Sequence, residues 1–223
     1  MQYIEAFFNL LGSFICHQMP ERTLRAGALL LPVCARDMGI YTGIFVAALF
    51  ITMSGRLKAQ KPPSIAMVIT MCLLMLPMIL DGMLSYCGII ETSNAARLFT
   101  GLFFGLPIPF LLVPAAHFSI NGANESKVLK HAGELIPVYC SGIILCMVLF
   151  WGYVPYFLSG SIFALGLLFL LSRISYTIFT RMQRYKQGKL YMLATAGTVC
   201  IIIFLYLLSQ FILQPLKRML LNG

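Results

Sequence analysis

Seven long apolar stretches, separated by short polar segments, constrain this chain more than any other feature. They cover residues 3–19, 38–54, 64–81, 96–117, 135–152, 154–172 and 191–213. Each approaches the roughly 20 residues that an α-helix needs to cross a bilayer. Backbone groups cannot go unpaired in lipid, and the stretches lack the alternating pattern of a transmembrane strand. The sequence therefore predicts an all-α, polytopic transmembrane helical bundle of about seven spans.

The connecting segments and the N-terminus bear on domain organisation. No connecting segment is long enough for a separate folded domain, so we expect residues 1–223 to form a single integral membrane domain. The first stretch lacks a basic region ahead of it and a small-residue cleavage site, so we expect a retained helix and not a signal peptide. A re-entrant hairpin between Thr23 and Cys34 is an alternative for the segment that follows.

The basic residues that produce the net charge of +9 collect in a few loops. They are Arg56, Lys58, Lys61, Lys127, Lys130, Arg173, Arg181, Arg184, Lys186 and Lys189. This distribution is typical of cytoplasmic loops in membrane proteins, and it argues against nucleic acid as a partner. We expect a multi-pass protein of the cell membrane whose partners are membrane lipids, with basic side chains near anionic headgroups.

If the basic loop 55–63 is cytoplasmic, the polar side chains elsewhere sort to one side. The helix before this loop runs inward and the helix after it runs outward. The segments on the outer side then carry Cys16, His17, Arg22, Cys34, Arg36, Asp37, Asp81, Asn94 and Arg97. Such groups are costly to hold at the mouth of apolar helices, so we interpret their convergence as a functional site.

Two GxxxG patterns adjoin this polar set, Gly39–Gly43 and Gly101–Gly105. Small residues at this spacing let helix backbones approach closely. If the two helices cross there, Asp37 and Arg97 come within ion-pair range. The fourth apolar stretch is expected to kink or break at its prolines, Pro107, Pro109 and Pro114.

Several groups of the polar set are legitimate zinc ligands. The candidate ligands are Cys16, His17, Cys34 and Asp37, with Asp81 in reserve. Their spacing differs from a standard finger or ribbon. A disulfide between Cys16 and Cys34, tying the first helix to the second, explains the cysteines equally well outside the cytoplasm. A thiol oxidoreductase ranks third, because 17 residues separate the two cysteines where C-x-x-C is usual.

Arginines outnumber acids at this face, and arginine suits bidentate recognition of phosphate or carboxylate. Arg25 is expected only to snorkel or to pair with an acid, and Asp81 to pair with Arg97 or a metal. We therefore expect metal-dependent chemistry, with zinc as the cofactor, on an anionic lipid or lipid-linked substrate. The candidate catalytic residues are Asp81, Arg36, Arg97 and Asn94. The alternatives are a transporter or metal-ion carrier, and a structural membrane protein with a Cys16–Cys34 bridge.

The polar motifs resemble one known family. CHQMPER at 16–22, LPVCARDMGIYTG at 31–43, Asp81-Gly82 and SNAARLFTG at 93–101 are together similar to the prokaryotic membrane proteins grouped as domain of unknown function family 2085. The resemblance covers about residues 14–105, with Thr23 where the family usually has serine. It implies a signature-bearing core at 1–117, with 118–223 as additional helices, and it implies no reaction. The implied signature positions are Cys16, His17, Gln18, Pro20, Glu21, Arg22, Cys34, Arg36, Gly39, Tyr41, Asp81, Asn94, Arg97 and Gly101.

Overall fold

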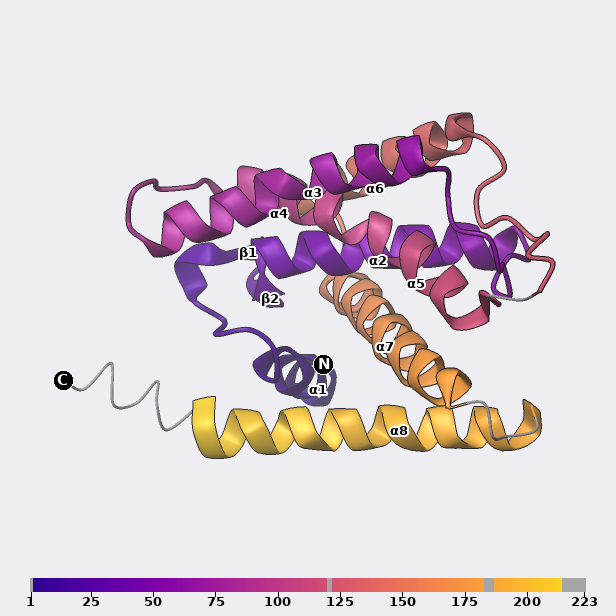
Figure 1. Cartoon of the computed structure of the whole chain (residues 1–223). Helices are drawn as coiled ribbons and strands as arrows, with labels where there is room; N and C mark the ends of the chain where they lie inside the picture. The colour runs from indigo at the N-terminus through magenta and orange to yellow at the C-terminus, as the bar shows by residue number, and fades with distance from the viewer. Residues whose placement is uncertain (1, 120–121, 183–186, 214–223) are drawn as a thin grey trace.

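The computed structural model describes residues 2–119, 122–182 and 187–213, which form a helical bundle with one small β-hairpin (Figure 1). The elements are α1 (Gln2–Ser13), β1 (Thr23–Ala26), β2 (Leu29–Cys34), α2 (Ala35–Met53), α3 (Ile65–Tyr86), α4 (Asn94–Gly105), α5 (Pro107–His117), α6 (Leu135–Phe150), α7 (Tyr156–Arg181) and α8 (Gln187–Leu208). Within the described ranges, six helical segments are long and apolar enough to span a membrane. The predicted all-α bundle is confirmed.

The first of the seven predicted spans is shorter than its apolar stretch. α1 has 12 residues and ends at Ser13, so it is about 18 Å long at 1.5 Å per residue. That length falls short of the roughly 30 Å hydrocarbon core of a bilayer. α1 instead packs against β2 and α7. A Cβ atom at Gly12 would collide with the carbonyl oxygen of Pro32, so the glycine permits this close approach to the hairpin.

α2 is the central helix of the bundle, and it contacts α4, α5, α6 and α7. In the most apolar stretch of α2, 56% is buried inside the protein, whereas only 11% of the corresponding stretch is buried in α3 and in α8. The two peripheral helices therefore turn most of their surface outward, where apolar side chains such as Ile69 and Phe204 are exposed. Outward-facing apolar residues are expected of a protein whose solvent is lipid.

The two GxxxG patterns bring α2 and α4 together, as the sequence predicts. A Cβ atom at Gly39 would collide with the carbonyl oxygen of Leu98, and one at Gly101 with that of Arg36. A Cβ atom at Gly43 would lie 2.7 Å from the carbonyl oxygen of Leu102. The backbones of the two helices thus touch directly, which only glycine allows.

The predicted break in the fourth apolar stretch is also present. α4 ends at Gly105 and α5 begins at Pro107, with Leu106 as the residue between them. Proline has no N–H to donate into the preceding turn, and its ring crowds that turn. The two helices together form the span Asn94–His117.

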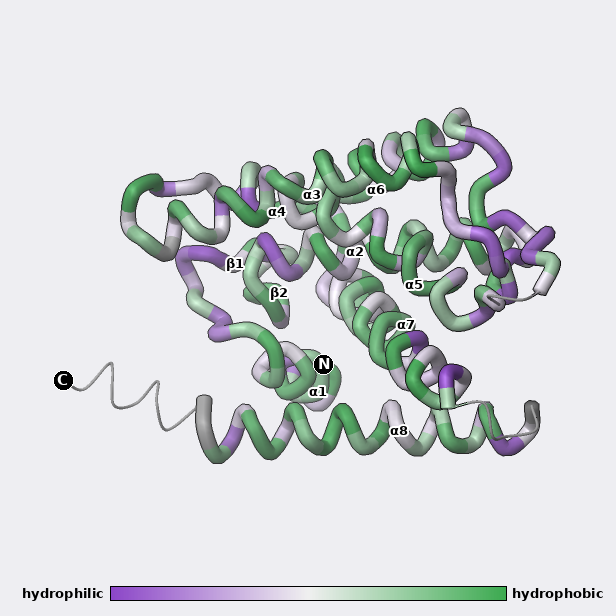
Figure 2. The backbone as a smooth tube through the Cα atoms, viewed as in Figure 1, coloured by the Kyte–Doolittle hydropathy of each residue, from purple (hydrophilic) through white to green (hydrophobic). Residues whose placement is uncertain are grey.

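The polar segments gather at two opposite ends of the bundle (Figures 1 and 2). At one end, Lys61 pairs with Lys127 in an isolated β-bridge, and Arg56 makes two hydrogen bonds to Glu134, at 2.7 and 2.9 Å. This basic end holds the loops that were expected to be cytoplasmic. Arg184 and Lys186 of that expectation lie outside the described residues.

The opposite end carries the β-hairpin, which takes the place of the expected helix end or re-entrant segment. β1 and β2 are antiparallel, with Thr23 opposite Cys34 and Ala26 opposite Leu29. Gly27 has a φ of 61°, a conformation that glycine adopts at little cost. The hairpin leads directly into α2, because Cys34 ends β2 and is also the N-cap residue of α2.

Candidate functional site

The loop 14–22 between α1 and the hairpin carries the first polar cluster, and the Gln18 side chain fixes its shape. The Nε2 atom of Gln18 donates to the carbonyl oxygens of Asn9, at 2.9 Å, and Pro32, at 2.8 Å. Gln18 has a φ of 51°, which is uncommon for a residue other than glycine. The two hydrogen bonds hold the chain in this strained turn and keep Cys16 against the hairpin.

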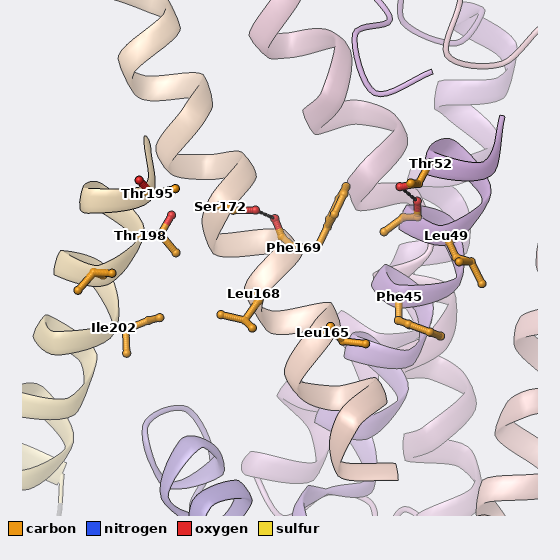
Figure 3. A pocket seen from close by; sticks show the side chains of 12 residues that line it. Phe45, Leu49, Thr52, Leu165, Leu168, Phe169, Ser172, Thr195, Thr198 and Ile202 are labelled. Atoms are coloured by element: carbon orange, nitrogen blue, oxygen red, sulfur yellow. Dashed lines mark hydrogen bonds between the residues drawn. The ribbon is translucent and has the colours of Figure 1, made fainter. Parts of the chain in front are cut away.

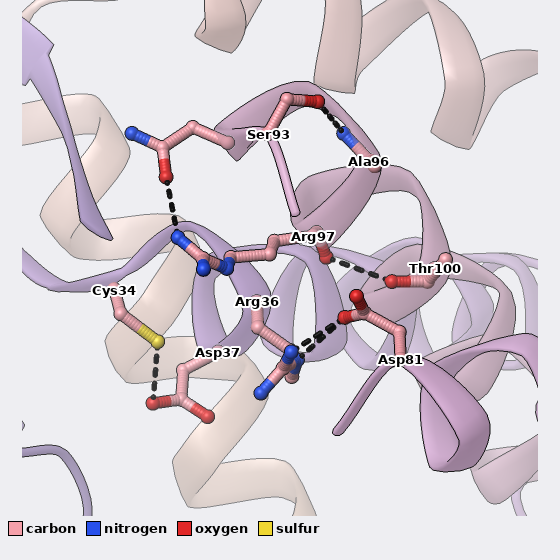
Figure 4. Close-up of polar contacts among 9 residues, drawn as sticks. Cys34, Arg36, Asp37, Asp81, Ser93, Ala96, Arg97 and Thr100 are labelled. Atoms are coloured by element: carbon pink, nitrogen blue, oxygen red, sulfur yellow. Dashed lines mark hydrogen bonds and ion pairs between the residues drawn. The ribbon is translucent and has the colours of Figure 1, made fainter. Parts of the chain in front are cut away.

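Cys16 and Cys34 meet beneath this turn. The Cys16 sulfur accepts hydrogen bonds from the backbone N–H of Cys34, at 3.2 Å, and of Gln18, at 3.4 Å. The Cys34 thiol donates to Oδ2 of Asp37, at 3.2 Å (Figure 4). The two sulfurs and a carboxylate oxygen of Asp37 all lie within 4.8 Å of one another. Three of the four predicted metal ligands therefore form one cluster.

The protonation of the two thiols is linked. The contact between them raises the pKa of Cys16 and lowers the pKa of Cys34, and burial raises the pKa of Cys16 further. The negative charge of Asp37 acts against a thiolate at either position. The cluster thus gives up one proton readily and holds the second, since two sulfur anions beside a carboxylate repel one another. A divalent cation between them would remove this repulsion.

His17, the fourth predicted ligand, is not part of this cluster of ligand atoms. Its side chain is exposed and lines the same cavity. Adjacent residues project in different directions, which is why Cys16 and His17 do not both face the same point. The structure therefore gives a three-residue ligand set, with His17 on the surrounding wall.

Asp81 is bound by Arg36, and not by Arg97 as the sequence suggested. The Nε and Nη2 atoms of Arg36 both donate to Oδ2 of Asp81, at 3.2 and 2.5 Å (Figure 4). The pair bridges α2 and α3, and Asp81 is 7% exposed. The other carboxylate oxygen, Oδ1, is buried without a hydrogen-bond partner among the described residues. The long Arg36 side chain reaches α3, and so it takes the position that was assigned to Arg97.

Arg97 and Asp37 do not form the predicted ion pair, although α2 and α4 cross as expected. Nη1 of Arg97 donates instead to Oδ1 of Asn94 on the same helix, at 3.3 Å. Asn94 in turn donates to the backbone carbonyl oxygen of Glu21, at 3.1 Å, which ties α4 to the first polar loop. Asp37 is engaged by the Cys34 thiol.

Arg97 is buried but incompletely bonded. It is 8% exposed, and its Nε atom has no hydrogen-bond partner within the described part of the chain. A buried guanidinium with an unused donor is costly unless an acceptor reaches it. Among the described residues, the Asn94 side chain accepts a hydrogen bond from the Arg97 guanidinium, and this side chain is uncharged. Arg97 is thus available to an anionic ligand.

These groups surround a cavity of about 400 Å³. Its wall includes Cys16, His17, Gln18, Arg22, Cys34, Arg36, Asp37, Ser85 and Arg97. Asp81 and Asn94 are not in this wall; they hold Arg36 and Arg97 from behind. Ser85 was not anticipated, because a lone serine at the end of an apolar helix carries no sequence signal. Arg25 is exposed and outside the cavity, in keeping with its expected minor role.

The donor set of the cluster suits a zinc ion better than it suits most other metals. Two thiolates and one carboxylate are ligands of borderline-soft Zn²⁺, whereas Ca²⁺ and Mg²⁺ prefer oxygen alone. Three protein ligands leave a fourth position open, as in catalytic zinc sites. The sulfurs are present as free thiols, and their proximity is also compatible with the disulfide alternative.

Comparisons with known proteins point to one family. Residues 16–111 match the family described as predicted membrane protein (DUF2085). An uncharacterised protein of Methanocaldococcus jannaschii is 34% identical over 113 residues, which are 51% of this chain and 70% of the relative. An uncharacterised protein of Methanothermobacter thermautotrophicus is 32% identical over 118 residues, which are 53% of this chain and 89% of the relative. No solved structure matches the chain.

Proposed function

Because the chain belongs to the DUF2085 family of predicted membrane proteins, we propose a function for the cavity that its signature residues line. The cavity is a zinc site that performs metal-dependent chemistry on an anionic lipid or lipid-linked substrate. It faces the extracytoplasmic side of the cell membrane. The observation that carries this proposal is the cluster of Cys16, Cys34 and Asp37, whose ligand atoms lie within 4.8 Å of one another. Arg22 and Arg97 line the same cavity and form no ion pair with a carboxylate of the described residues.

The proposed zinc ligands are the Cys16 and Cys34 sulfurs and a carboxylate oxygen of Asp37. The anionic form of a cysteine is the one that binds metal. The backbone N–H of Gln18 donates to the Cys16 sulfur and offsets part of the rise in the pKa of Cys16 that the Cys34 contact and burial cause. When bound, zinc supplies a Lewis acid that polarises a phosphoryl or acyl oxygen. His17 on the adjoining wall is within the same cavity and can hold or transfer a proton there.

Arg97 and Arg22 are the proposed anion-binding groups. Both line the cavity, and neither forms an ion pair with a carboxylate within the described residues. Arg36 is already neutralised by Asp81, so the pair serves to position α2 against α3. A phosphate or carboxylate that accepts from the unused Arg97 donor would satisfy it. A lipid headgroup reaches this depth because the cavity lies at the ends of membrane-spanning helices.

Metal content is the first test. Purified wild-type protein is expected to carry about one zinc per chain by elemental analysis, and Cys16→Ser, Cys34→Ser and Asp37→Asn are each expected to lose most of it. Cys87→Ser is the matched control, because Cys87 is an exposed cysteine at the end of α3, outside the ligand cluster. A thiol count that finds Cys16 and Cys34 oxidised, with no metal present, would replace the zinc site with the structural disulfide.

The substrate class can be tested by using the absorption of the bound metal as the readout for ligand binding. Protein loaded with Co²⁺ in place of zinc has visible absorption bands that change when a ligand enters the open position. A short-chain lipid phosphate is expected to change these bands, and Arg97→Gln is expected to weaken its apparent affinity by about tenfold or more, the effect of one charge-assisted hydrogen bond. Arg25→Gln should leave the affinity unchanged. Equal affinities in the Arg97→Gln and wild-type proteins would remove the anion-binding half of the proposal.

A further inference from the structure

A second region of interest lies on the other half of the bundle, between α2, α7 and α8. It is an apolar groove of about 560 Å³ (Figure 3). Its walls include Phe45 and Leu49 of α2, Leu165 and Leu168 of α7, and Val199 and Ile202 of α8. The groove opens toward the lipid-facing surface of the spans, so lipid chains are the molecules that can enter it.

The groove continues toward the basic end of the protein. A second cavity, of about 260 Å³, shares five lining residues with it: Thr52, Phe169, Ser172, Thr195 and Thr198. The wall of this second cavity adds Arg173, Tyr176 and Tyr191. Leu165 and Arg173 are eight residues apart on α7, about 12 Å at 1.5 Å per residue. That distance is most of the hydrocarbon depth of one leaflet, which is about 15 Å.

Arg173 is a positive charge within a membrane-spanning helix, and no carboxylate of the described residues forms an ion pair with it. Its guanidinium lies over the rings of Phe169, at 5.4 Å, and Tyr176, at 5.8 Å. Its Nη1 atom donates to the carbonyl oxygen of Leu57, at 3.4 Å. These contacts hold the guanidinium toward the basic end but leave its charge unneutralised. A charge at this depth is costly without a counterion.

Further positive charge adjoins this position. A third cavity, of about 380 Å³, also reaches Tyr176, and its lining includes Lys58 and Arg181. No acidic side chain of the described residues lines any of these three cavities. The combined surface is therefore apolar along the spans and cationic at the end, which matches a molecule with an apolar chain and an anionic head.

We propose that this surface binds one anionic phospholipid from the leaflet at the basic end of the protein. An acyl chain lies in the groove between α2, α7 and α8, and the phosphate accepts hydrogen bonds from Arg173, with Lys58 and Arg181 nearby. The site is at the opposite end from the zinc cavity and is independent of the function proposed for it. The phosphate supplies a counterion to Arg173 in a helix that is otherwise suited to lipid.

The test titrates lipids of identical acyl chains into delipidated protein in detergent and counts bound lipid by native mass spectrometry. Phosphatidylglycerol is expected to bind at least about tenfold more tightly than zwitterionic phosphatidylcholine, and Arg173→Gln is expected to abolish that preference. Thr195→Trp places a large ring in the groove and is expected to weaken both lipids alike. The matched controls are Arg25→Gln, at the other end, and Ala196→Trp, beside Thr195 on α8 but outside the groove.

Four results would overturn the proposal. The first is equal binding of the two lipids to the wild-type protein, and the second is an unchanged preference in Arg173→Gln. The third is displacement of phosphatidylglycerol by glycerol phosphate at similar concentration, because that result would make the site one for a free phosphate. Loss of preference in Arg25→Gln would also move the site to the hairpin end. The zinc content of Arg173→Gln should match that of the wild type. A failure of the lipid-site proposal can therefore be distinguished from a failure of the zinc-site proposal.

Discussion

The contact between α2 and α4 makes a graded prediction about glycine substitutions. A Cβ atom at Gly43 would lie 2.7 Å from the Leu102 carbonyl oxygen, which is 0.7 Å inside the ordinary contact distance of 3.4 Å. The Leu102 carbonyl oxygen belongs to the helix backbone, so it cannot move aside as the end of a flexible side chain can. Gly43→Ala must therefore push the helices apart, at a cost of about 1–3 kcal/mol in the free energy of unfolding. Gly39→Ala is expected to cost more, because its Cβ atom would overlap the Leu98 carbonyl oxygen more severely.

Thermal unfolding in detergent, followed by the loss of helical circular dichroism, measures this effect. For a chain of this length 1 kcal/mol shifts the midpoint by roughly 2–4 °C, so Gly43→Ala should unfold several degrees below the wild type. Gly82→Ala in α3 is the control, since a Cβ atom there has no neighbour within 4 Å. Alanine stabilises a helix relative to glycine by about 1 kcal/mol, and this gain is shared by all three Gly→Ala variants. The comparison with Gly82→Ala therefore isolates the effect of the helix contact. If Gly43→Ala and Gly39→Ala unfold at the same temperature as Gly82→Ala, the direct backbone contact is wrong.

Three further predictions concern the cavity. Asp81→Asn leaves the half-buried Arg36 guanidinium without its counterion and should lower the free energy of unfolding by about 3 kcal/mol, measured by the same thermal assay. A change below about 1 kcal/mol would contradict an ion pair that is shielded from water. In metal-free protein the lowered pKa of Cys34 should place the pH midpoint of Cys34 alkylation below that of an ordinary cysteine, and Cys16→Ser should raise this midpoint. Mass spectrometry of the alkylated Cys34 peptide across a pH series measures both midpoints. An unshifted midpoint in Cys16→Ser would refute the link between the thiols. Gln18→Ala removes two hydrogen bonds of about 1 kcal/mol each, and it should weaken zinc retention against a chelator although Gln18 touches no metal.

Local patterns in the sequence were sufficient to predict the features of the fold that depend on single helices. Six of the seven apolar stretches correspond to spanning segments of the described residues, and the first was wrong as a span. The three prolines predicted the break at Leu106, and the glycine spacing predicted the crossing of α2 and α4. Each feature is set by residues within a single apolar stretch or by a short local motif. Sequence periodicity reports such features directly.

The β-hairpin was not predicted as β-structure, because β2 does not alternate and β1 has only four residues. β2 reads Leu29-Leu-Leu-Pro-Val-Cys34, a continuous apolar run that contains a proline. Such a run cannot be distinguished from a helix segment by period alone. Its pairing with β1 depends on the turn at Gly27 and on α1, which packs against β2.

The partners within the polar set could be assigned only in part. Cys16, Cys34 and Asp37 were expected to meet and do so, because the chain doubles back through the hairpin. The partner of Asp81 was wrong, since the direction in which the Arg36 side chain leaves α2 depends on how α2 and α3 sit together. Helix-end placement identifies which residues share one end of a bundle, and rotation about each helix axis decides which of them bond.

The hydroxyl of Ser209, just beyond the end of α8, donates to the carbonyl oxygen of Ser13, at 2.8 Å, and Tyr206 packs edge-on against Phe14. The far end of α8 is thus fastened next to the turn that holds Cys16, in the same compartment as the candidate zinc site. A reporter enzyme fused directly after residue 213 would consequently be delivered to whichever compartment the cavity opens into. A phosphatase that is active only in an oxidising compartment, or a fluorescent protein that matures only in the cytoplasm, would then read the sidedness of the cavity in living cells.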